Sequence, residues 1–140
     1  MRLLEPNFAK DPNGLVAVVV QDDKTKEVLM LAYTDRAGWQ KSIETNKVSL
    51  YSRSRKKSWV KGEESGNFMQ IVDMRIDCDG DAILFLVNPQ GKGVACHTNA
   101  RSCFYRDFLG KMLMPAPEHG EKEELLSVEF ELKNSQDQCR

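Results

Sequence analysis

The sequence lacks the features that would mark a membrane or secreted protein. Its longest apolar runs, such as LVAVVV at residues 15–20, have the length of a strand. That is far short of the roughly 20 residues that a membrane-spanning helix needs. The first residues, MRLLEPNFAKDPNG, lack the apolar centre of a secretory signal peptide. We therefore expect a cytoplasmic protein with no membrane partner.

The chain also carries almost no net charge. Its 20 Lys and Arg residues face 21 Asp and Glu residues, which leaves a formal charge of −1. Proteins that bind nucleic acid or a membrane surface over much of their area normally carry an excess of basic residues. The balance argues against either kind of partner for the protein as a whole.

Internal repeats are absent, and 140 residues suit one domain of ordinary size. Such a chain can bury a real hydrophobic core, so its four cysteines are not needed as disulfides. In a cytosolic chain of this size, metal binding or catalysis is the more common use of cysteine. Cys139 lies in the polar tail KNSQDQCR, and we expect it to be unrelated to the other three.

Short apolar runs bounded by turn residues predict a strand-rich domain. Strands are expected at residues 14–22, 27–33, 47–52, 68–76 and 82–87, with the first two forming a hairpin. Residues 52–67 are polar and basic and are expected to be a loop with a short strand around Trp59. After a connector rich in proline and charge, LLSVEFEL at residues 125–132 alternates as a half-buried strand does, or as one that pairs with a partner chain.

One main helix is expected between the second and third strands. Thr34 or Asp35 can cap its start, and Asn46 can end it in a left-handed conformation. Trp39 and Ile43 are four residues apart and would share its buried face. The fold class is therefore α+β, as a strand-rich single domain with one main helix.

The segment IDCDGDA places hard and soft metal ligands side by side. Asp77, Asp79 and Asp81 suit Mg²⁺, whereas the thiol of Cys78 suits Zn²⁺. In an extended chain the three aspartates would share one face and Cys78 the other, so the segment could face two different metals. Alternate residues would then be about 6.6 Å apart, which is wide for one ion, unless Gly80 bends the chain. Acidic residues on a turn are also commonly just solvated.

Two further cysteines lie downstream, in ACHTNARSC. Cys96 and Cys103 are seven positions apart, a spacing that argues against a zinc finger. Together with Cys78 they would make an open three-thiolate zinc site, with His97 as a fourth ligand or a general base. The alternative is that the three cysteines are small buried residues of the core.

Basic and aromatic residues alternate in YSRSRKKSWVKGEESGN. Arginine binds phosphate through two hydrogen bonds, small residues let a ligand approach the backbone, and aromatic rings can stack on a base. A solvated basic loop and a single-stranded RNA site are the alternatives. The predicted substrate-binding residues are Arg53, Ser54, Arg55, Trp59, Lys61, Gly62, Glu63, Ser65 and Gly66 from this segment, with Thr98 from the cysteine segment.

Four blocks together resemble the phosphoribosyl-AMP cyclohydrolase family of histidine biosynthesis. They occur in the order QDDKTKEVLMLAYTDRAGW, YSRSRKKSWVKGEESGN, DCDGDAILFLV and ACHTNARSCFYR, and the resemblance runs from about Asn7 to Arg106. Residues 1–106 would then form the catalytic domain, and residues 107–140 a C-terminal extension that packs on this domain or on the dimer partner. The chain leaves no room for the second enzyme domain found fused in some bacteria, so a monofunctional enzyme is expected.

The resemblance implies an intertwined cytoplasmic homodimer with metal sites at the subunit interface, to which both chains contribute. It implies Zn²⁺ on Cys78, Cys96 and Cys103, Mg²⁺ on the three aspartates, and His97 as the proton-transfer residue. Zinc-bound hydroxide would attack the amidine carbon of the purine ring of phosphoribosyl-AMP and open it to the formimino-carboxamide ribotide.

The sequence departs from the family pattern where Asn99 replaces a common glycine. Asn tolerates a positive φ, so little loss is expected. The rival hypotheses are a non-catalytic zinc-stabilised module, with a closed four-ligand site, and a related hydrolase with a different substrate.

Overall fold

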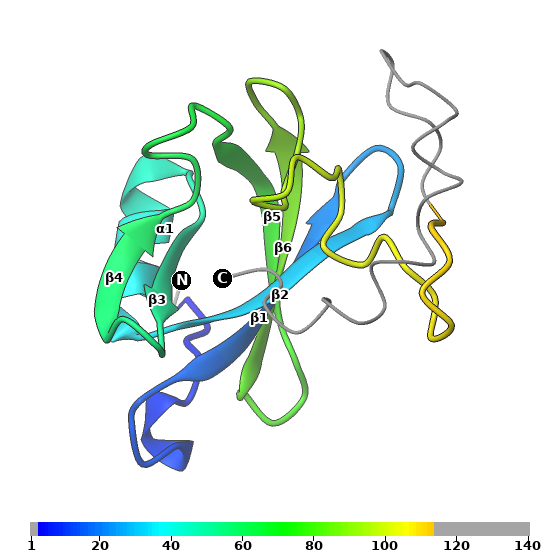
Figure 1. Ribbon diagram of the computed structural model, residues 1–140. Coiled ribbons are helices and arrows are strands. Elements are labelled where there is room, and N and C mark those ends of the chain that lie inside the picture. Colours follow the sequence, from blue (N-terminus) through cyan, green and yellow to red (C-terminus); the bar gives the residue numbers. More distant parts are fainter. Residues whose placement is uncertain (1–2, 114–140) are drawn as a thin grey trace.

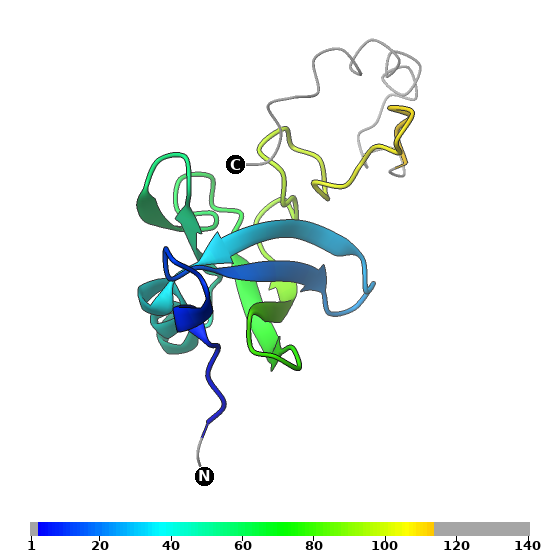
Figure 2. The same cartoon turned by 90° about the horizontal axis from the view of Figure 1, so that it is seen from below.

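The computed structural model describes residues 3–113, and its largest element is a four-stranded sheet (Figure 1). The strands are β1 (Val16–Asp22), β2 (Val28–Thr34), β5 (Met69–Ile76) and β6 (Ala82–Pro89), in the order β2-β1-β6-β5. β1 is antiparallel to β2 and parallel to β6, and β5 is antiparallel to β6. Figure 2 shows β1 and β2 side by side as a long twisted ribbon.

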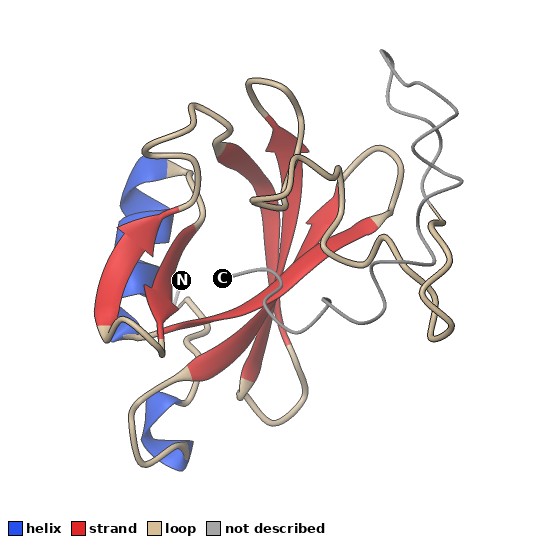
Figure 3. Cartoon of the chain, viewed as in Figure 1, coloured by secondary structure: helices blue, strands red, loops and turns tan. Residues whose placement is uncertain are grey.

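Two smaller units complete the fold. A short hairpin of β3 (Ser49–Ser52) and β4 (Lys57–Val60) forms a second sheet, and the helix α1 (Arg36–Thr45) lies beside it. A single 3₁₀ turn, η1 (Phe8–Lys10), precedes β1. Strands predominate over helix in Figure 3, which confirms the expected α+β class with one main helix. Within residues 3–113, neither helix is long and apolar enough to cross a membrane.

The strands form where the apolar pattern predicted them. β1 alternates strictly between buried and half-buried residues, because successive side chains of a strand point to opposite faces. Val18 and Val20 are completely buried, as are Phe85 and Val87 on the neighbouring strand β6. The predicted hairpin of β1 and β2 and the short strand around Trp59 are both confirmed.

The helix begins and ends at the expected residues. The Asp35 side chain accepts a hydrogen bond from the Gly38 N–H (2.8 Å), and Asn46 ends α1 with a φ of 56°. Trp39 is buried and stacks on Phe85 with 6.2 Å between the ring centroids.

The prediction that Ile43 shares this buried face is wrong, because Ile43 is 37% exposed. Ser42 takes the inward position instead. Its hydroxyl donates to the Gly38 carbonyl (2.9 Å) and accepts from the Ser49 N–H (2.9 Å), which ties α1 to β3. The hydrogen bonds of one small polar residue, rather than a second apolar side chain, thus set which way the helix faces.

The segments carrying the predicted metal ligands lie apart from each other. The turn between β5 and β6 is at the bottom of the view in Figure 1, whereas the chain after β6 turns at the top and then runs to the right. The predicted strand at residues 125–132, most of the expected C-terminal extension and Cys139 lie outside the described residues.

Candidate active site

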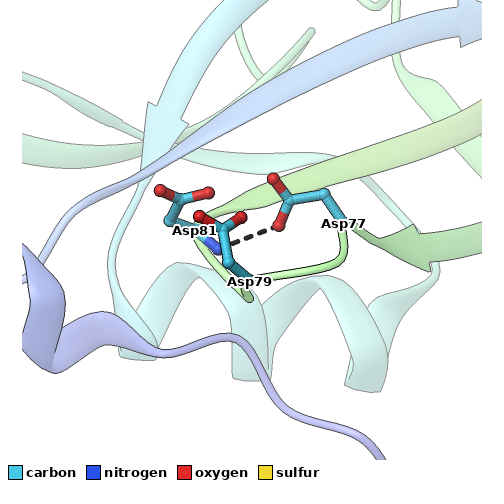
Figure 4. Close-up of side chains that lie close together, drawn as sticks. All are labelled: Asp77, Asp79 and Asp81. Carbon is cyan, nitrogen blue, oxygen red and sulfur yellow. Dashed lines mark hydrogen bonds between the residues drawn. The ribbon is translucent and has the colours of Figure 1, made fainter.

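The three aspartates converge on a tight turn at one end of the sheet. Their carboxylate oxygens lie within 4.8 Å of one another, and all three residues are exposed (Figure 4). The Asp77 side chain accepts the backbone N–H groups of Asp81 (3.0 Å) and Ala82 (3.2 Å), and Gly80 has a φ of +80°. The expected bend at Gly80 is confirmed. Simple alternation along an extended strand is wrong for this segment, because these bonds fold it into a turn.

A lysine ammonium neutralises part of this negative charge. Lys10 Nζ lies 3.0 Å from Asp79 Oδ2 and 3.7 Å from Asp81 Oδ2. Its hydrogen bond lowers the pKa of the Asp79 carboxyl. The nearby carboxylates of Asp77 and Asp79 raise the pKa of Asp81, because close like charges disfavour ionisation. The chemistry of the donor set and the mutual distances fit a hard divalent cation.

Cys96 and Cys103 lie on one segment, residues 95–103, which is hydrogen-bonded to β2 and lies away from the aspartate turn. The Cys96 N–H donates to the Ala100 carbonyl (3.1 Å), and the Cys103 N–H donates to the Leu29 carbonyl of β2 (2.7 Å). Cys96 is buried, and its sulfur accepts a hydrogen bond from the Thr98 hydroxyl (3.1 Å). Asn99 has a φ of 67°, so the residue that replaces the common glycine adopts the conformation expected of it.

Cys78 is not within reach of these two cysteines in the same chain. Cys78 lies in the exposed turn that precedes Ala82, the first residue of β6. Cys103 is hydrogen-bonded to Leu29, which is level with the middle of β6. At about 3.3 Å per residue, at least about 10 Å along the strand separates Ala82 from the level of Leu29. Two sulfurs on one zinc ion are only about 4 Å apart, given a Zn–S distance of about 2.3 Å. Between residues 3 and 113, the aspartates alone form a group of three His, Cys, Asp or Glu ligands this close together.

A cavity of about 290 Å³ lies between the cysteine segment (residues 95–103) and the basic loop (residues 51–67). Cys96 and His97 form one wall, and His97 is exposed to solvent there. The opposite wall comes from β4 and the loop that follows it. Of the predicted substrate-binding residues, those that line the cavity are Arg55, Trp59, Lys61, Gly62, Glu63 and Ser65.

The other predicted contacts lie outside this cavity. Arg53 stacks on the ring of Tyr33 from β2, with 3.9 Å from Cζ to the ring centroid. Ser54 pairs with the Ser52 hydroxyl (3.4 Å), and Thr98 is engaged with the Cys96 sulfur. Gly66 is exposed and ends the turn by donating its N–H to the Gly62 carbonyl (2.8 Å).

Sequence reasoning missed several cavity residues. The most informative is Asn67, which is 9% exposed and whose Oδ1 accepts the Lys92 N–H (2.9 Å), so it joins the basic loop to the turn after β6. The available signal in the sequence was an asparagine directly after Ser65 and Gly66, at the end of the loop. The remaining missed residues are Ser52, Lys57, Val60, Glu64, Val94 and Asn99.

Gly62 shapes the cavity through its backbone. Its φ is +93°, and a Cβ at this position would lie 2.6 Å from the Asn67 carbonyl oxygen. Gly66 has a similar φ of +79°, but a Cβ there would meet nothing within 4 Å. We expect Gly62→Ala to lower the free energy of unfolding by about 3 kcal/mol or more, and Gly66→Ala by about 1 kcal/mol. Urea unfolding of the two variants measures this difference, and equal losses would refute the steric argument.

Comparison with known proteins identifies the family. The family model for phosphoribosyl-AMP cyclohydrolase matches residues 30–105. A phosphoribosyl-AMP cyclohydrolase from Clostridium botulinum is 52% identical over 101 residues, covering 72% of this chain and 90% of the relative. One from Neisseria meningitidis is 49% identical over 100 residues, covering 71% and 76%. A histidine biosynthesis bifunctional protein from Deinococcus radiodurans is 48% identical over 107 residues, covering 76% of this chain and 47% of the relative. The chain belongs to the phosphoribosyl-AMP cyclohydrolase family.

Proposed function

We propose that the protein opens the six-membered ring of phosphoribosyl-AMP in histidine biosynthesis, acting as a cytoplasmic homodimer with zinc and magnesium. The observation that carries this proposal is the cavity. It brings Cys96 and His97 against a loop that supplies both cationic and aromatic side chains. A thiol, an imidazole and groups suited to a nucleotide thus line one cavity, which supports the proposal.

The cysteines fit zinc if two chains share the site. Three thiolates with one open position are the donor set of a catalytic zinc site. The Thr98 hydroxyl donates a hydrogen bond to the Cys96 sulfur, and such a bond orients a metal ligand. Cys96 and Cys103 would come from one chain and Cys78 from its partner, because Cys78 lies in a turn away from their segment. Zinc bound there would supply a water whose pKa is lowered toward neutrality.

The basic loop is suited to hold the nucleotide. Trp59 offers a flat surface on which a purine can stack. Lys61 Nζ lies 5.5 Å from the centroid of the Trp59 ring. Arg55 and Lys57 line the same cavity and can bind a phosphoryl group. Because Arg53 lies outside the cavity on Tyr33, we assign it to the edge of the site rather than to its centre.

His97 is the residue that would move protons. Its imidazole is exposed at the cavity wall next to Cys96, so it can reach a water that attacks the amidine carbon of the ring. In this scheme His97 accepts the proton of that water and returns it to the ring nitrogen when the carbon–nitrogen bond breaks. The products then balance, since one water is added and one ring bond is lost.

Incubation of the purified protein with phosphoribosyl-AMP, zinc and magnesium tests the proposal. Ring opening changes the ultraviolet absorbance of the purine, which can be followed continuously. Turnover of phosphoribosyl-AMP but not of other adenine nucleotides would support it. No turnover, with zinc held by four protein ligands, would instead support the non-catalytic zinc-stabilised module.

The aspartate turn would hold magnesium and neutralise a phosphoryl group of the substrate. We expect Asp79→Asn to raise the magnesium concentration needed for half-maximal activity by about tenfold, because a carboxylate ligand is lost, while bound zinc stays unchanged. Activity measured across magnesium concentrations, with zinc content by atomic absorption, checks both halves. Equal loss of the two metals would mean a single mixed site. Asp73→Asn is the matched control, since Asp73 is an exposed aspartate that pairs with Arg75 outside the turn.

A further inference from the structure

Arg101 ties the cysteine segment to the hairpin of β1 and β2. Its Nη2 donates to Asp22 Oδ2 (2.7 Å) and its Nε to Glu27 Oε1 (2.5 Å). Asp22 ends β1, and Glu27 immediately precedes β2. One guanidinium therefore binds two carboxylates that are more than 70 positions away in the sequence and flank the turn between β1 and β2.

Backbone hydrogen bonds hold the carboxylate of Asp22 in place independently of Arg101. Asp22 is 5% exposed, and its Oδ1 accepts the backbone N–H groups of Lys24 (2.8 Å) and Thr25 (2.9 Å). Burial alone would raise the pKa of Asp22, but these N–H groups and the Arg101 guanidinium outweigh it, and the pKa lies below its ordinary value. A buried and ionised partner makes this a stronger restraint than an exposed ion pair.

The Arg101 backbone holds the other side of the same segment. Its carbonyl accepts the N–H of Ala95 (3.0 Å), the residue before Cys96. The next residue, Ser102, donates its hydroxyl to the Val28 carbonyl (2.7 Å). Cys96 and Cys103 thus lie on either side of a residue whose side chain and backbone are both anchored.

We propose that Arg101 is a positioning residue that keeps Cys96 and Cys103 at the separation needed to bind a metal ion together. The proposal rests on the zinc site of the proposed function, but Arg101 itself contacts neither the metal nor the cavity. Binding two carboxylates at once needs the planar fork of arginine, so the compact ammonium of lysine can replace only part of it.

The test compares Arg101→Met with Arg101→Lys in the full-length protein. Zinc affinity is measured by competition with a chromophoric chelator, and the cobalt-substituted protein reports thiolate geometry through its absorption spectrum. We expect Arg101→Met to weaken zinc binding by about 10-fold to 100-fold and to alter the cobalt spectrum, with Arg101→Lys in between. Arg75→Met is the matched control, because it removes an exposed arginine–aspartate pair (3.2 Å) on β5 and should leave both readouts unchanged.

Zinc affinity within twofold of the wild type in Arg101→Met would overturn the proposal, as would an equal loss in Arg75→Met. If Arg101→Met does not fold, Asp22→Asn decides, since it removes the buried charge that pairs with Arg101 while the amide oxygen can still accept the N–H groups of Lys24 and Thr25. Wild-type zinc affinity in that variant would also overturn the proposal.

Amide hydrogen exchange in the metal-free proteins separates this proposal from the proposed function. Faster exchange at Cys96 and Cys103 in Arg101→Met is expected whether or not the wild type turns over phosphoribosyl-AMP. Unchanged exchange would refute the positioning role even in an active enzyme. A wild type that binds no zinc would refute the proposed metal site instead.

Discussion

Cys96→Ser is expected to release zinc and to lower kcat/KM by at least about a thousandfold, because the attacking water would lose its activating metal. Cys96 is 4% exposed and lines the cavity next to His97, and under the proposed function its sulfur would hold the zinc ion there. Serine has nearly the same shape, but its hydroxyl is a much poorer zinc ligand than a thiolate. Zinc content by atomic absorption and turnover in the same preparation measure the two losses together.

Cys139→Ser is the control for this experiment. Cys139 is a cysteine outside every block that resembles the family, so its loss should leave zinc and turnover unchanged. Retention of both zinc and activity in Cys96→Ser would mean that Cys96 belongs to the core, which is the reading its burial alone would favour. Thermal unfolding of the two variants shows whether any loss comes from misfolding.

Local chemistry explains which parts of the fold could be predicted from the sequence. The strands of the ribbon follow apolar alternation, and Asp35 and Asn46 mark the ends of α1 through hydrogen bonds with near neighbours in the chain. Ile43 was misplaced because the inward face of α1 depends on Ser49, a residue on another element. Spacing alone cannot show which of two adjacent helical positions will find such a partner.

Only part of the cavity lining could be predicted from the sequence, and its geometry could not. The turn at Gly80 could be expected, because three aspartates cannot converge on a straight strand. The parallel pairing of β1 with β6 could not, since it joins residues 65 positions apart, such as Ala17 and Ala82, with no local signal. That pairing, together with the hydrogen bond from Cys103 to Leu29, separates Cys103 from the turn that carries Cys78. Nor does a sequence pattern connect Arg101 with Asp22.

Because Cys78 lies far from Cys96 and Cys103, we expect activity to return when variants of these cysteines are mixed. Mixing Cys78→Ser with Cys96→Ser, each inactive alone, is expected to restore about a quarter of the wild-type activity after subunit exchange. If each zinc site takes Cys78 from one chain and the other two cysteines from its partner, a mixed dimer has one site with both substitutions and one with none. Random exchange makes about half of the dimers mixed, and each has one working site out of two.

A mixture of Cys96→Ser with Cys103→Ser is the matched control. These two cysteines lie on one segment, so the same chain would supply both of them to a site. Each of the two sites in a mixed dimer would therefore keep one substitution. No activity should return in this mixture. Recovery here, or its absence from the Cys78→Ser mixture, would contradict the shared site. If each chain bound zinc with its own three cysteines, neither mixture would regain activity. Such a site would also require the β5–β6 turn and the Cys103 segment to meet across at least about 10 Å of strand.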